Sequence, residues 1–412
     1  MNKFTQIAMV AAIFPIVVPS SHVFAATESV IYSFQGGADG ANPQGELTEK
    51  NGTFYGVTEF GGGGNNPACN ASCGTVYALH PQTGAESVMH VFGKGSDGWS
   101  PYAGLTAAKG MLYGTTNLGG SNTTGDCEFV GCGTVYSINM GSGEESVIYS
   151  FQGFPGDAES PESSLTNIKG TLYGTSSAGR GNDKQGCPSG CGTVFLMQLQ
   201  TGSERVIHSF YSDGRGGRDP QARLTYAGGI LYGTTSSGGS DNVGTLFSID
   251  IRKSNRMRVI HTFGSKGGDG AEPYAGVIDV NGTLYGTTEW GGTYGYGTVY
   301  AIDAKAGTET ILHSFNDNRQ DGFNPTADLL ELNGVLYGTT PYGGLNSAGT
   351  VYSIDLATGI ETIIYSFCVT DGCADGETPY SGLTNIKGRL YGTTYSGGAR
   401  DAGTVYAISL KD

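Results

Sequence analysis

The sequence predicts an all-β protein, a seven-bladed β-propeller of four-stranded antiparallel blades closed into a ring by its N-terminal strand. Three observations predict this fold. A Leu-Tyr-Gly-Thr-Thr pentamer recurs in seven versions at steps of 52 to 60 residues, short β-branched and aromatic runs alternate with glycine and asparagine clusters, and the chain begins and ends on different strands of the repeat. A period of about 50 residues is typical of propellers and solenoids, and such runs are typical of strands.

The composition agrees with short strands joined by tight turns. Glycine contributes 71 residues, only 14% of the residues are charged, and the formal net charge is −15. Almost no window places apolar residues at helical spacing. An acidic protein of this size repels phosphate backbones, so we expect no nucleic acid partner.

The first residues are expected to lie outside the fold. Met1 to Ala25 contains Lys3, an apolar run from Ile7 to Val18 and a small-residue end, which is the pattern of a secretory signal peptide. A transmembrane anchor is the alternative, but the apolar run is shorter than the ~20 residues that a spanning helix needs. We therefore expect residues 1–25 to be a signal peptide and residues 26–412 to be one propeller without a membrane span.

Within each repeat we expect four strands, lettered A to D outward from the axis. Strand D is a run such as Glu28 to Phe34, strand A a run such as Tyr102 to Thr106, strand B the pentamer, and strand C a Gly-Thr-Val-Tyr element such as that at Gly297. Turns such as Asn281-Gly282 join A to B, because Asn-Gly pairs adopt the left-handed backbone that tight hairpins need. Four strands cannot bury both faces alone, so the blades must stack on one another.

The two ends of the chain indicate how the ring closes. The mature chain would begin with a D strand, Glu28 to Phe34, and end with a C strand, Gly403 to Leu410. Pairing of these two strands would complete the last blade and leave no exposed sheet edge. An open solenoid is the alternative, and it would leave the first D strand without a partner.

The eight cysteines fall into four local pairs. An even count with such spacing in an exported chain predicts short-range disulfides that stiffen loops, and a metal site is the alternative. Neither His nor Cys ligands stand near any pair to complete a tetrahedron. The predicted disulfides are Cys69-Cys73, Cys127-Cys132, Cys187-Cys191 and Cys368-Cys373.

These motifs resemble a known family. The run LYGTTxxGG, a following GTVYxID, a strand ending in Ser-Phe and a DGxxP loop resemble the GloVer tandem repeat of exported bacterial proteins, and more loosely the kelch repeat. The resemblance covers essentially the whole mature chain. It implies a propeller and an exported bacterial protein but no particular activity. Some relatives end in a sorting or anchoring tail, and the stop at Lys411-Asp412 favours a periplasmic or secreted protein.

The long, variable loops are expected together on one face of the propeller. In this meander the D–A and B–C loops emerge on one side, opposite the short A–B and C–D turns, so function should be sought there. Each D–A loop repeats an aspartate, which could bind calcium but is also ordinary turn chemistry, the role we favour. These aspartates are Asp39, Asp97, Asp157, Asp269, Asp321 and Asp375, with Asp213 or Asp219 in the odd loop. On this interpretation no cofactor is required.

The histidines do not indicate an enzyme. Four of them occupy a strand D position where the other blades have tyrosine, so we expect fillers of an outer strand rather than general bases. They are His90, His208, His261 and His313.

Aromatic residues break the sevenfold symmetry in blades 5, 6, 7 and 1, which form one continuous arc. Flat rings beside carboxylates and amides are how proteins hold sugar faces, and rings that merely cover the loop bases are the alternative. The candidate ligand-binding residues are Phe60, Trp290, Tyr294, Tyr296, Tyr342 and Tyr395.

Two further sets could carry catalysis. Glu59 and Glu289 occupy the same position in blades 1 and 5 and could act as acid and base on a glycosidic bond, although three blades separate them. Arg215 and Arg218 belong to a basic cluster on blades 3 and 4 that could hold uronate carboxylates. Solvated loop charge is the simpler interpretation of the arginines.

Three functions remain open from the sequence. The first hypothesis is a monomeric propeller that binds an extracellular or envelope polysaccharide or oligosaccharide through its long-loop face. The second is a polysaccharide lyase or glycoside hydrolase acting at the mouth of the central channel. The third is a scaffold for protein interactions without catalysis.

Overall fold

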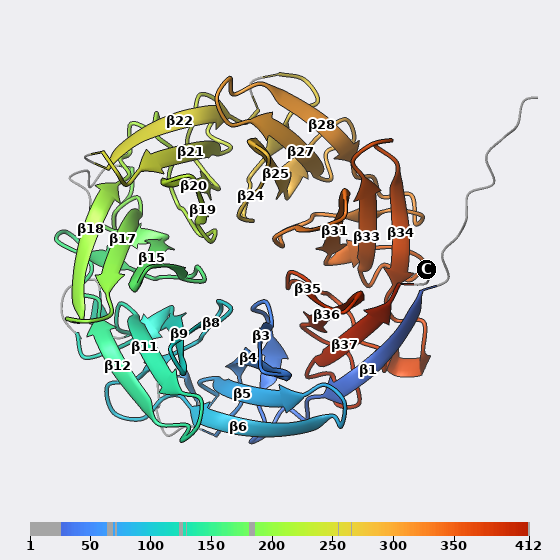
Figure 1. Cartoon of the computed structure of the whole chain (residues 1–412), viewed down its shortest axis with the longest axis horizontal. Helices are drawn as coiled ribbons and strands as arrows, with labels where there is room; N and C mark the ends of the chain where they lie inside the picture. The colour runs from blue at the N-terminus through green and yellow to red at the C-terminus, as the bar shows by residue number, and fades with distance from the viewer. Residues whose placement is uncertain are drawn as a thin grey trace, which may run out of the picture.

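The computed structural model describes residues 26–63, 69–70, 72–122, 127–128, 130–180, 186–253, 255–264 and 266–410. These residues form seven antiparallel four-stranded blades around one axis (Figure 1), as predicted, and in blade 1 a short strand, β2 (Ala41–Pro43), adds to the sheet. The predicted signal peptide, residues 1–25, lies outside the described residues. Within those ranges no helix is long and apolar enough to cross a membrane.

The strands of blades 1 to 7 follow the predicted order from the axis outward. Strand A is β3 (Thr48–Lys50), β8 (Thr106–Ala108), β14 (Thr166–Ile168), β19 (Thr225–Ala227), β24 (Ile278–Val280), β30 (Leu330–Leu332) and β35 (Thr384–Ile386). Strand B is β4 (Thr53–Phe60), β9 (Met111–Thr116), β15 (Thr171–Ser176), β20 (Ile230–Thr235), β25 (Thr283–Thr288), β31 (Val335–Thr340) and β36 (Arg389–Thr394). Strand C is β5 (Thr75–His80), β11 (Thr134–Asn139), β17 (Thr193–Gln198), β21 (Thr245–Asp250), β27 (Thr298–Asp303), β33 (Thr350–Asp355) and β37 (Thr404–Ser409). Strand D is β6 (Ala85–Val91), β12 (Glu145–Ser150), β18 (Ser203–Ser209), β22 (Arg256–Thr262), β28 (Glu309–Ser314), β34 (Glu361–Ser366) and β1 (Thr27–Ser33).

Strand A lies closer to the A–B turn than the sequence predicted. In blade 2 it covers Thr106–Ala108, so most of the predicted run from Tyr102 to Thr106 precedes it. The displaced segment begins at Pro101, and proline has no N–H to donate to a strand ladder. Tyr102 is therefore free of the sheet and can face the channel.

The sequence repeat is explained by packing between blades. An aromatic side chain of strand C packs against the last phenylalanine of strand D in the preceding blade, for example Tyr300 on Phe263 with ring centroids 5.1 Å apart and ring planes inclined by 57°. Such a pair occurs at all seven blade interfaces. The same ring covers the glycine of the pentamer, because a Cβ on Gly286 would lie 2.4 Å from the Tyr300 hydroxyl.

The two threonines of the pentamer have separate hydrogen bonds. The first usually donates to the next blade, as Thr234 Oγ1 does to the carbonyl of Ala275 at 2.8 Å. The second pairs with strand C of its own blade, as Thr288 does with Thr298 at 2.8 Å. Both roles are structural, and they satisfy buried hydroxyls that would otherwise destabilise the core.

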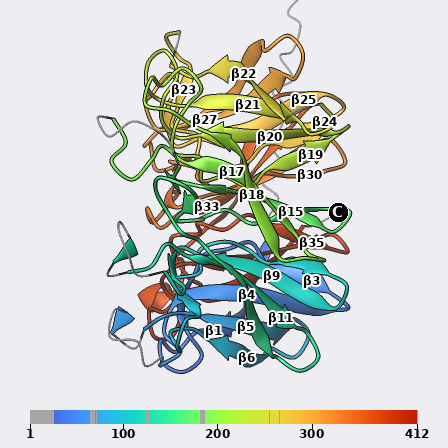
Figure 2. The same ribbon diagram turned by 90° about the vertical axis from the view of Figure 1, so that its left-hand side faces the viewer.

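The long-loop face carries a second layer of short pairings. Each D–A loop pairs with the start of the B–C loop of the following blade, so both loop types lie on one side of the ring. The paired ribbons are β7 (Gly98–Trp99) with β10 (Leu118–Gly119), β13 (Ala158–Glu159) with β16 (Ala178–Gly179), β23 (Gly270–Ala271) with β26 (Trp290–Gly291), and β29 (Gly322–Phe323) with β32 (Tyr342–Gly343). In the side view of Figure 2, β23 lies toward the left edge, and the inner strands β19, β24 and β35 lie toward the right.

The ring closes as predicted. β1 pairs antiparallel with β37, with Thr27 opposite Ser409 and Ser33 opposite Thr404, and the N–H of Phe34 donates to the carbonyl of Gly403. All four predicted disulfides are present. The loop that contains Cys368 and Cys373 also forms the single-turn 3₁₀ helix η3 (Asp371–Cys373).

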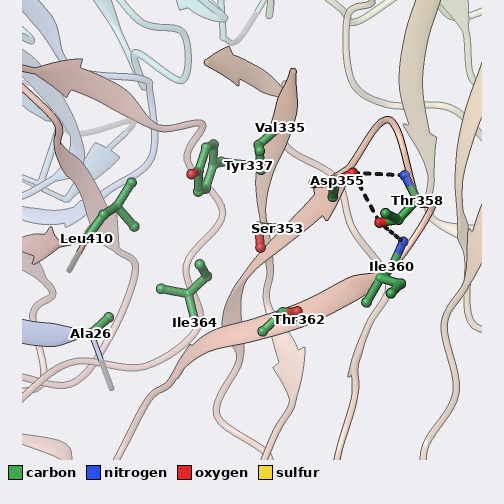
Figure 3. Close-up of a pocket in the computed structure, with 10 residues that line it drawn as sticks. All are labelled: Ala26, Val335, Tyr337, Ser353, Asp355, Thr358, Ile360, Thr362, Ile364 and Leu410. Atoms are coloured by element: carbon green, nitrogen blue, oxygen red, sulfur yellow. Dashed lines mark hydrogen bonds between the residues drawn. The ribbon is translucent and has the colours of Figure 1, made fainter. Parts of the chain in front are cut away.

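Closure of the ring by the two ends of the chain leaves a cavity between blades 6 and 7. In blades 1, 2, 3 and 5 the C–D turn lies against strand D of the preceding blade, as Gly307 does against Ile260. In blade 7, strand C (β37) and strand D (β1) come from opposite ends of the chain, so no such turn joins them. Ile364 instead lines an apolar cavity of about 430 Å³ together with Ala26 and Leu410 (Figure 3).

Candidate ligand-binding site

The mouth of the channel is lined by one residue from every D–A loop. In each loop this residue directly follows the repeated proline, and with Glu289 the seven line one cavity of about 420 Å³ on the long-loop face. Proline fixes its own φ and so sets the direction in which the next residue leaves the loop. The seven residues are Gln44, Tyr102, Glu162, Gln221, Tyr274, Thr326 and Tyr380.

Backbone hydrogen bonds hold each of these loops between two blades. The residue before the proline has a positive φ, for example 57° at Glu272. The N–H of Glu272 donates to the carbonyl of Val243 in the preceding blade at 2.7 Å, and its carbonyl accepts from the N–H of Glu289 at 3.1 Å. The lining side chains therefore stand on a rigid frame, which favours preorganised binding.

Ion pairs cross the channel below the mouth. Arg223 lies 3.6 Å from Glu46 of blade 1 and 3.3 Å from Asp328 of blade 6, and Asp328 also accepts from the N–H of Gly276 at 2.6 Å. The charge of Asp328, and more weakly that of Glu46, raises the pKa of Arg223. These pairs form the floor of the site, so a ligand would approach from the long-loop face.

Glu59 is held beneath the rim of the mouth. Its side chain is buried, and its carboxylate accepts from Gln44 Nε2 at 2.6 Å and from the Tyr395 hydroxyl at 3.3 Å. Burial raises the pKa of Glu59, and hydrogen bonds from Tyr102, Gln44 and Tyr395 oppose that rise. This carboxylate orients residues that line the cavity but does not line it itself.

Two other glutamates do line the cavity. Burial raises the pKa of Glu162 to about 7, against hydrogen bonds from Ser177 and Asn117. Burial, together with the charge of Glu272, also raises the pKa of Glu289. Carboxyl groups with raised pKa values in a cavity can exchange protons with a ligand.

Aromatic rings form a continuous ladder along the rim from blade 5 to blade 7. Tyr296 contacts Phe323, Phe323 stacks on Tyr342 at 5.7 Å and 30°, and the hydroxyls of Tyr342 and Tyr380 are 2.9 Å apart. Tyr380 then packs edge-on against Tyr395 at 5.7 Å. Three of the six aromatic residues singled out in the sequence are thus joined, through Phe323 and Tyr380.

The other three candidate aromatics are exposed on the loops. Trp290, at 42% exposure, hydrogen-bonds the carboxylate of Glu289, and Tyr294, at 59%, lines a second cavity of about 390 Å³ with Tyr296. Phe60 ends β4, where its backbone pairs with Ala41. These rings flank the mouth loops without lining the mouth cavity.

The two candidate arginines lie away from the mouth cavity. Arg218 donates to the side chain of Asn242 at 2.6 Å and pairs through its backbone with Ser237. The N–H of Arg215 donates to Asp213 at 3.2 Å. The arginine that does reach the channel is Arg223.

The repeated loop aspartates hold the blades together. Each lies against the tyrosine or histidine of strand D, within hydrogen-bond distance in five of the six and 3.6 Å from His261 in the sixth, and beside a glutamate on strand D of the next blade; we call each set an inter-blade acid triad. Tyr32, for example, donates to Asp39 at 2.9 Å and lies 3.4 Å from Glu86. The other five are His90-Asp97-Glu145, Tyr149-Asp157-Glu204, His261-Asp269-Glu309, His313-Asp321-Glu361 and Tyr365-Asp375-Glu28.

The seventh loop differs from the prediction. Neither Asp213 nor Asp219 takes the repeat position, because Gly216 stands there and Gly217 has the close approach to Thr235 that the other loops show for their own glycine. Asp219 instead precedes the proline. The prediction was wrong because this loop contains two aspartates, and neither of them belongs to an Asp-Gly-x-x-Pro run.

Two of the triads are groups that could hold a metal ion. In His261-Asp269-Glu309 and in His313-Asp321-Glu361, one ligand atom of each residue lies within 4.8 Å of the others. A third such group consists of Cys368, Cys373 and Glu377. The two cysteine sulfurs of this group are already bonded to each other in a disulfide.

The repeat pattern does not mark the position after each proline as a binding position. The proline itself recurs in every D–A loop, and the more conspicuous repeated residue is the aspartate four residues before it. A signal was present, because the position after the proline carries tyrosine, glutamine, glutamate or threonine in different blades. Only the fold places these seven residues around one opening.

The sequence matches a known family model. The model described as the Gloeobacter/Verrucomicrobia repeat matches residues 20–186 and 181–406. No curated protein matches the sequence.

Several solved structures share the fold. An oligogalacturonate lyase in complex with manganese is 13% identical, with a TM-score of 0.55 and coverage of 90% of each chain. An oligogalacturonate lyase from Vibrio parahaemolyticus is 10% identical, with a TM-score of 0.51 and coverage of 94% of this chain and 98% of its own. A puromycin-hydrolysing peptidase from Mycobacterium tuberculosis is 10% identical, with a TM-score of 0.54 and coverage of 95% of this chain and 54% of its own. At such identities the likeness shows the fold alone.

Proposed function

Since this chain belongs to the Gloeobacter/Verrucomicrobia repeat family, we propose that it is an exported propeller that binds an extracellular or envelope polysaccharide through the mouth of its long-loop face. One observation carries the proposal. Seven structurally equivalent positions around the mouth carry a mixture of tyrosine, amide, hydroxyl and carboxylate side chains that the repeat itself does not require.

The chemistry of the lining fits a sugar. Tyr102, Tyr274 and Tyr380 offer ring faces for apolar C–H surface, while Gln44 and Gln221 offer both donors and acceptors for hydroxyl groups. The aromatic ladder extends this surface outward toward Tyr296. A cavity of about 420 Å³ is large enough for a ligand of small-molecule size, so the remainder of a polymer would lie over the loops.

The test is affinity electrophoresis of the purified protein through gels containing neutral, acidic and amino polysaccharides. We expect at least one polysaccharide to retard the protein, and Tyr380→Ala to weaken that retardation by roughly tenfold, since an aromatic anchor contributes more than 1 kcal/mol. Tyr226→Ala is the matched control, because Tyr226 is an exposed tyrosine on β19 that does not line the mouth. Retardation by none of the polysaccharides would reject the function and leave the interaction scaffold.

Sugar binding as proposed needs no cofactor. A calcium ion held by the acidic loops would reveal itself as loss of retardation in EDTA, so the gels are run with and without the chelator. We expect no difference, because the loop aspartates already accept hydrogen bonds from backbone N–H groups and from tyrosine or histidine.

A second candidate function is glycoside hydrolysis. It is favoured by one observation, the two glutamates with raised pKa values, Glu162 and Glu289, in one cavity. A pair of carboxyl groups is what glycoside cleavage requires. New reducing ends after incubation with any retained polysaccharide, lost in Glu289→Gln, would establish this function; new unsaturated uronates would instead indicate a lyase.

A further inference from the structure

The mouth cavity has the wrong charge for acidic sugars. Of its eight lining residues two are glutamates and none is basic. Arg223, which lines the floor below the mouth, is paired with Glu46 and Asp328. An oligogalacturonate would therefore meet carboxylates without a compensating arginine or lysine.

Further carboxylates stand directly behind the lining. Glu272 accepts a hydrogen bond from the hydroxyl of Tyr274 at 3.5 Å, and its negative charge raises the pKa of Glu289. The charge of Asp219 likewise raises the pKa of Glu162. Of the described residues, Asn117, Ser177 and Asp219 face Glu162, so within that set it has hydrogen-bond donors but no cationic partner. The negative potential of the mouth is thus built from several loops at once.

Tyrosine faces complete the environment that a cation prefers. Tyr102, Tyr274 and Tyr380 come from the D–A loops that enter blades 2, 5 and 7, and all three line the same cavity as the two glutamates. An ammonium or guanidinium group is attracted electrostatically to the face of an aromatic ring. A neutral sugar would gain the ring contact but not the charge.

We propose that this site selects amino sugars with free ammonium groups, held between the Glu162 and Glu289 carboxylates and the tyrosine faces, over N-acetylated and uronate sugars. The inference rests on the proposed function, because it names the sugar class for the same site. The ammonium group would replace the missing cationic partner of Glu162, while the hydroxyls of the sugar would bond to Gln44 and Gln221.

The test compares three oligosaccharide probes of equal length by isothermal titration calorimetry: glucosamine oligomers, the same oligomers after N-acetylation, and galacturonate oligomers. We expect the glucosamine oligomers to bind roughly tenfold tighter than the acetylated ones. Their binding should weaken with added salt, because an ion pair at an open mouth is screened. Galacturonate oligomers should bind weakest.

Variants assign the selectivity to named groups. Glu162→Gln should reduce the preference for glucosamine oligomers over acetylated ones, because the amide keeps the shape of the side chain and loses its charge. Glu144 is an exposed glutamate on the short-turn face, so Glu144→Gln is the control. It should change neither the preference for glucosamine oligomers nor the affinity for acetylated ones. Equal binding of both forms, or tightest binding of galacturonate, would overturn the inference and leave polysaccharide binding intact. No binding of any glycan in the electrophoresis panel would reject the proposed function as well.

Discussion

The interface between blades 3 and 4 differs from the other six in a way that isolates one interaction. Six interfaces contain an inter-blade acid triad, whereas this one has Gly216 in place of the aspartate and Met257 in place of the glutamate. The methionine fills the space, since a Cβ on Gly216 would lie 2.9 Å from Met257 Cε. His208 remains, and burial lowers its pKa to about 4.

The comparison teaches that the two acids form a unit. Both are absent from the same interface, and the blades still stack through Phe210 and Phe247 with ring centroids 5.3 Å apart. A single buried carboxyl without its partner would be an uncompensated polar group, which costs more than losing both. Aromatic packing therefore closes the ring, and the acid pairs are an addition that can be exchanged for apolar contact.

The largest expected effect comes from breaking one pair. Asp269→Gly should destabilise the protein by about 3 kcal/mol, because Glu309 and His261 lose their shared partner in a buried interface. The double variant Asp269→Gly with Glu309→Met copies the blade 3–4 interface and should recover most of that loss. Urea denaturation midpoints followed by tryptophan fluorescence give both values. If the double variant is as unstable as the sum of the singles, the two acids do not act as a unit.

The reverse exchange should have a smaller effect. Met257→Glu places a carboxyl group opposite Gly216 without an aspartate to pair with, and we expect a loss of about 2 kcal/mol. Adding Gly216→Asp should restore stability, because the pair is then complete; Gly216 has no positive φ that would exclude a side chain. The same denaturation experiment measures it, and a double variant less stable than Met257→Glu alone would contradict the comparison.

The smallest expected effect is a dependence on pH. Burial and the charge of the neighbouring aspartate raise the pKa of Glu86 to about 7, and burial with Asp157 and Asp269 raises the pKa values of Glu204 and Glu309 to about 8. A group whose pKa is raised in the folded state stabilises the fold fully below its ordinary value of 4.5, and this contribution is lost as the pH rises through 7 to 8.

The melting temperature should therefore fall by a few degrees between pH 6.5 and pH 8.5. His208 is neutral in the folded protein throughout this window, because burial lowers its pKa from 6.5 to about 4. In the unfolded chain it still binds protons near pH 6.5, so it opposes the fall slightly at the start of the window. The variant that copies the blade 3–4 interface has one pair fewer and should show a shallower fall. Differential scanning calorimetry across the window measures both slopes, and a melting temperature that rises with pH would contradict the assignment of the protonated glutamates.

The sequence by itself determined the fold because the repeat encodes local geometry. Asn281-Gly282 has the positive φ values of a tight hairpin, 56° and 88°, and the second threonine of the pentamer bonds to strand C of its own blade, as Thr288 does to Thr298. The same reasoning paired β1 with β37, since a strand without a partner could be counted from the letters alone. The residues of a turn and the number of strands in each repeat can both be read from the sequence.

Only the tertiary structure decided the site. The seven residues that follow the prolines are separated by 50 residues or more along the chain, and the repeat alone does not show that they surround one opening. They converge because seven loops turn inward after a proline around one axis, so their neighbourhood is a property of the ring rather than of any repeat. The partnership of Gly216 with Met257 has the same origin, because it joins two blades.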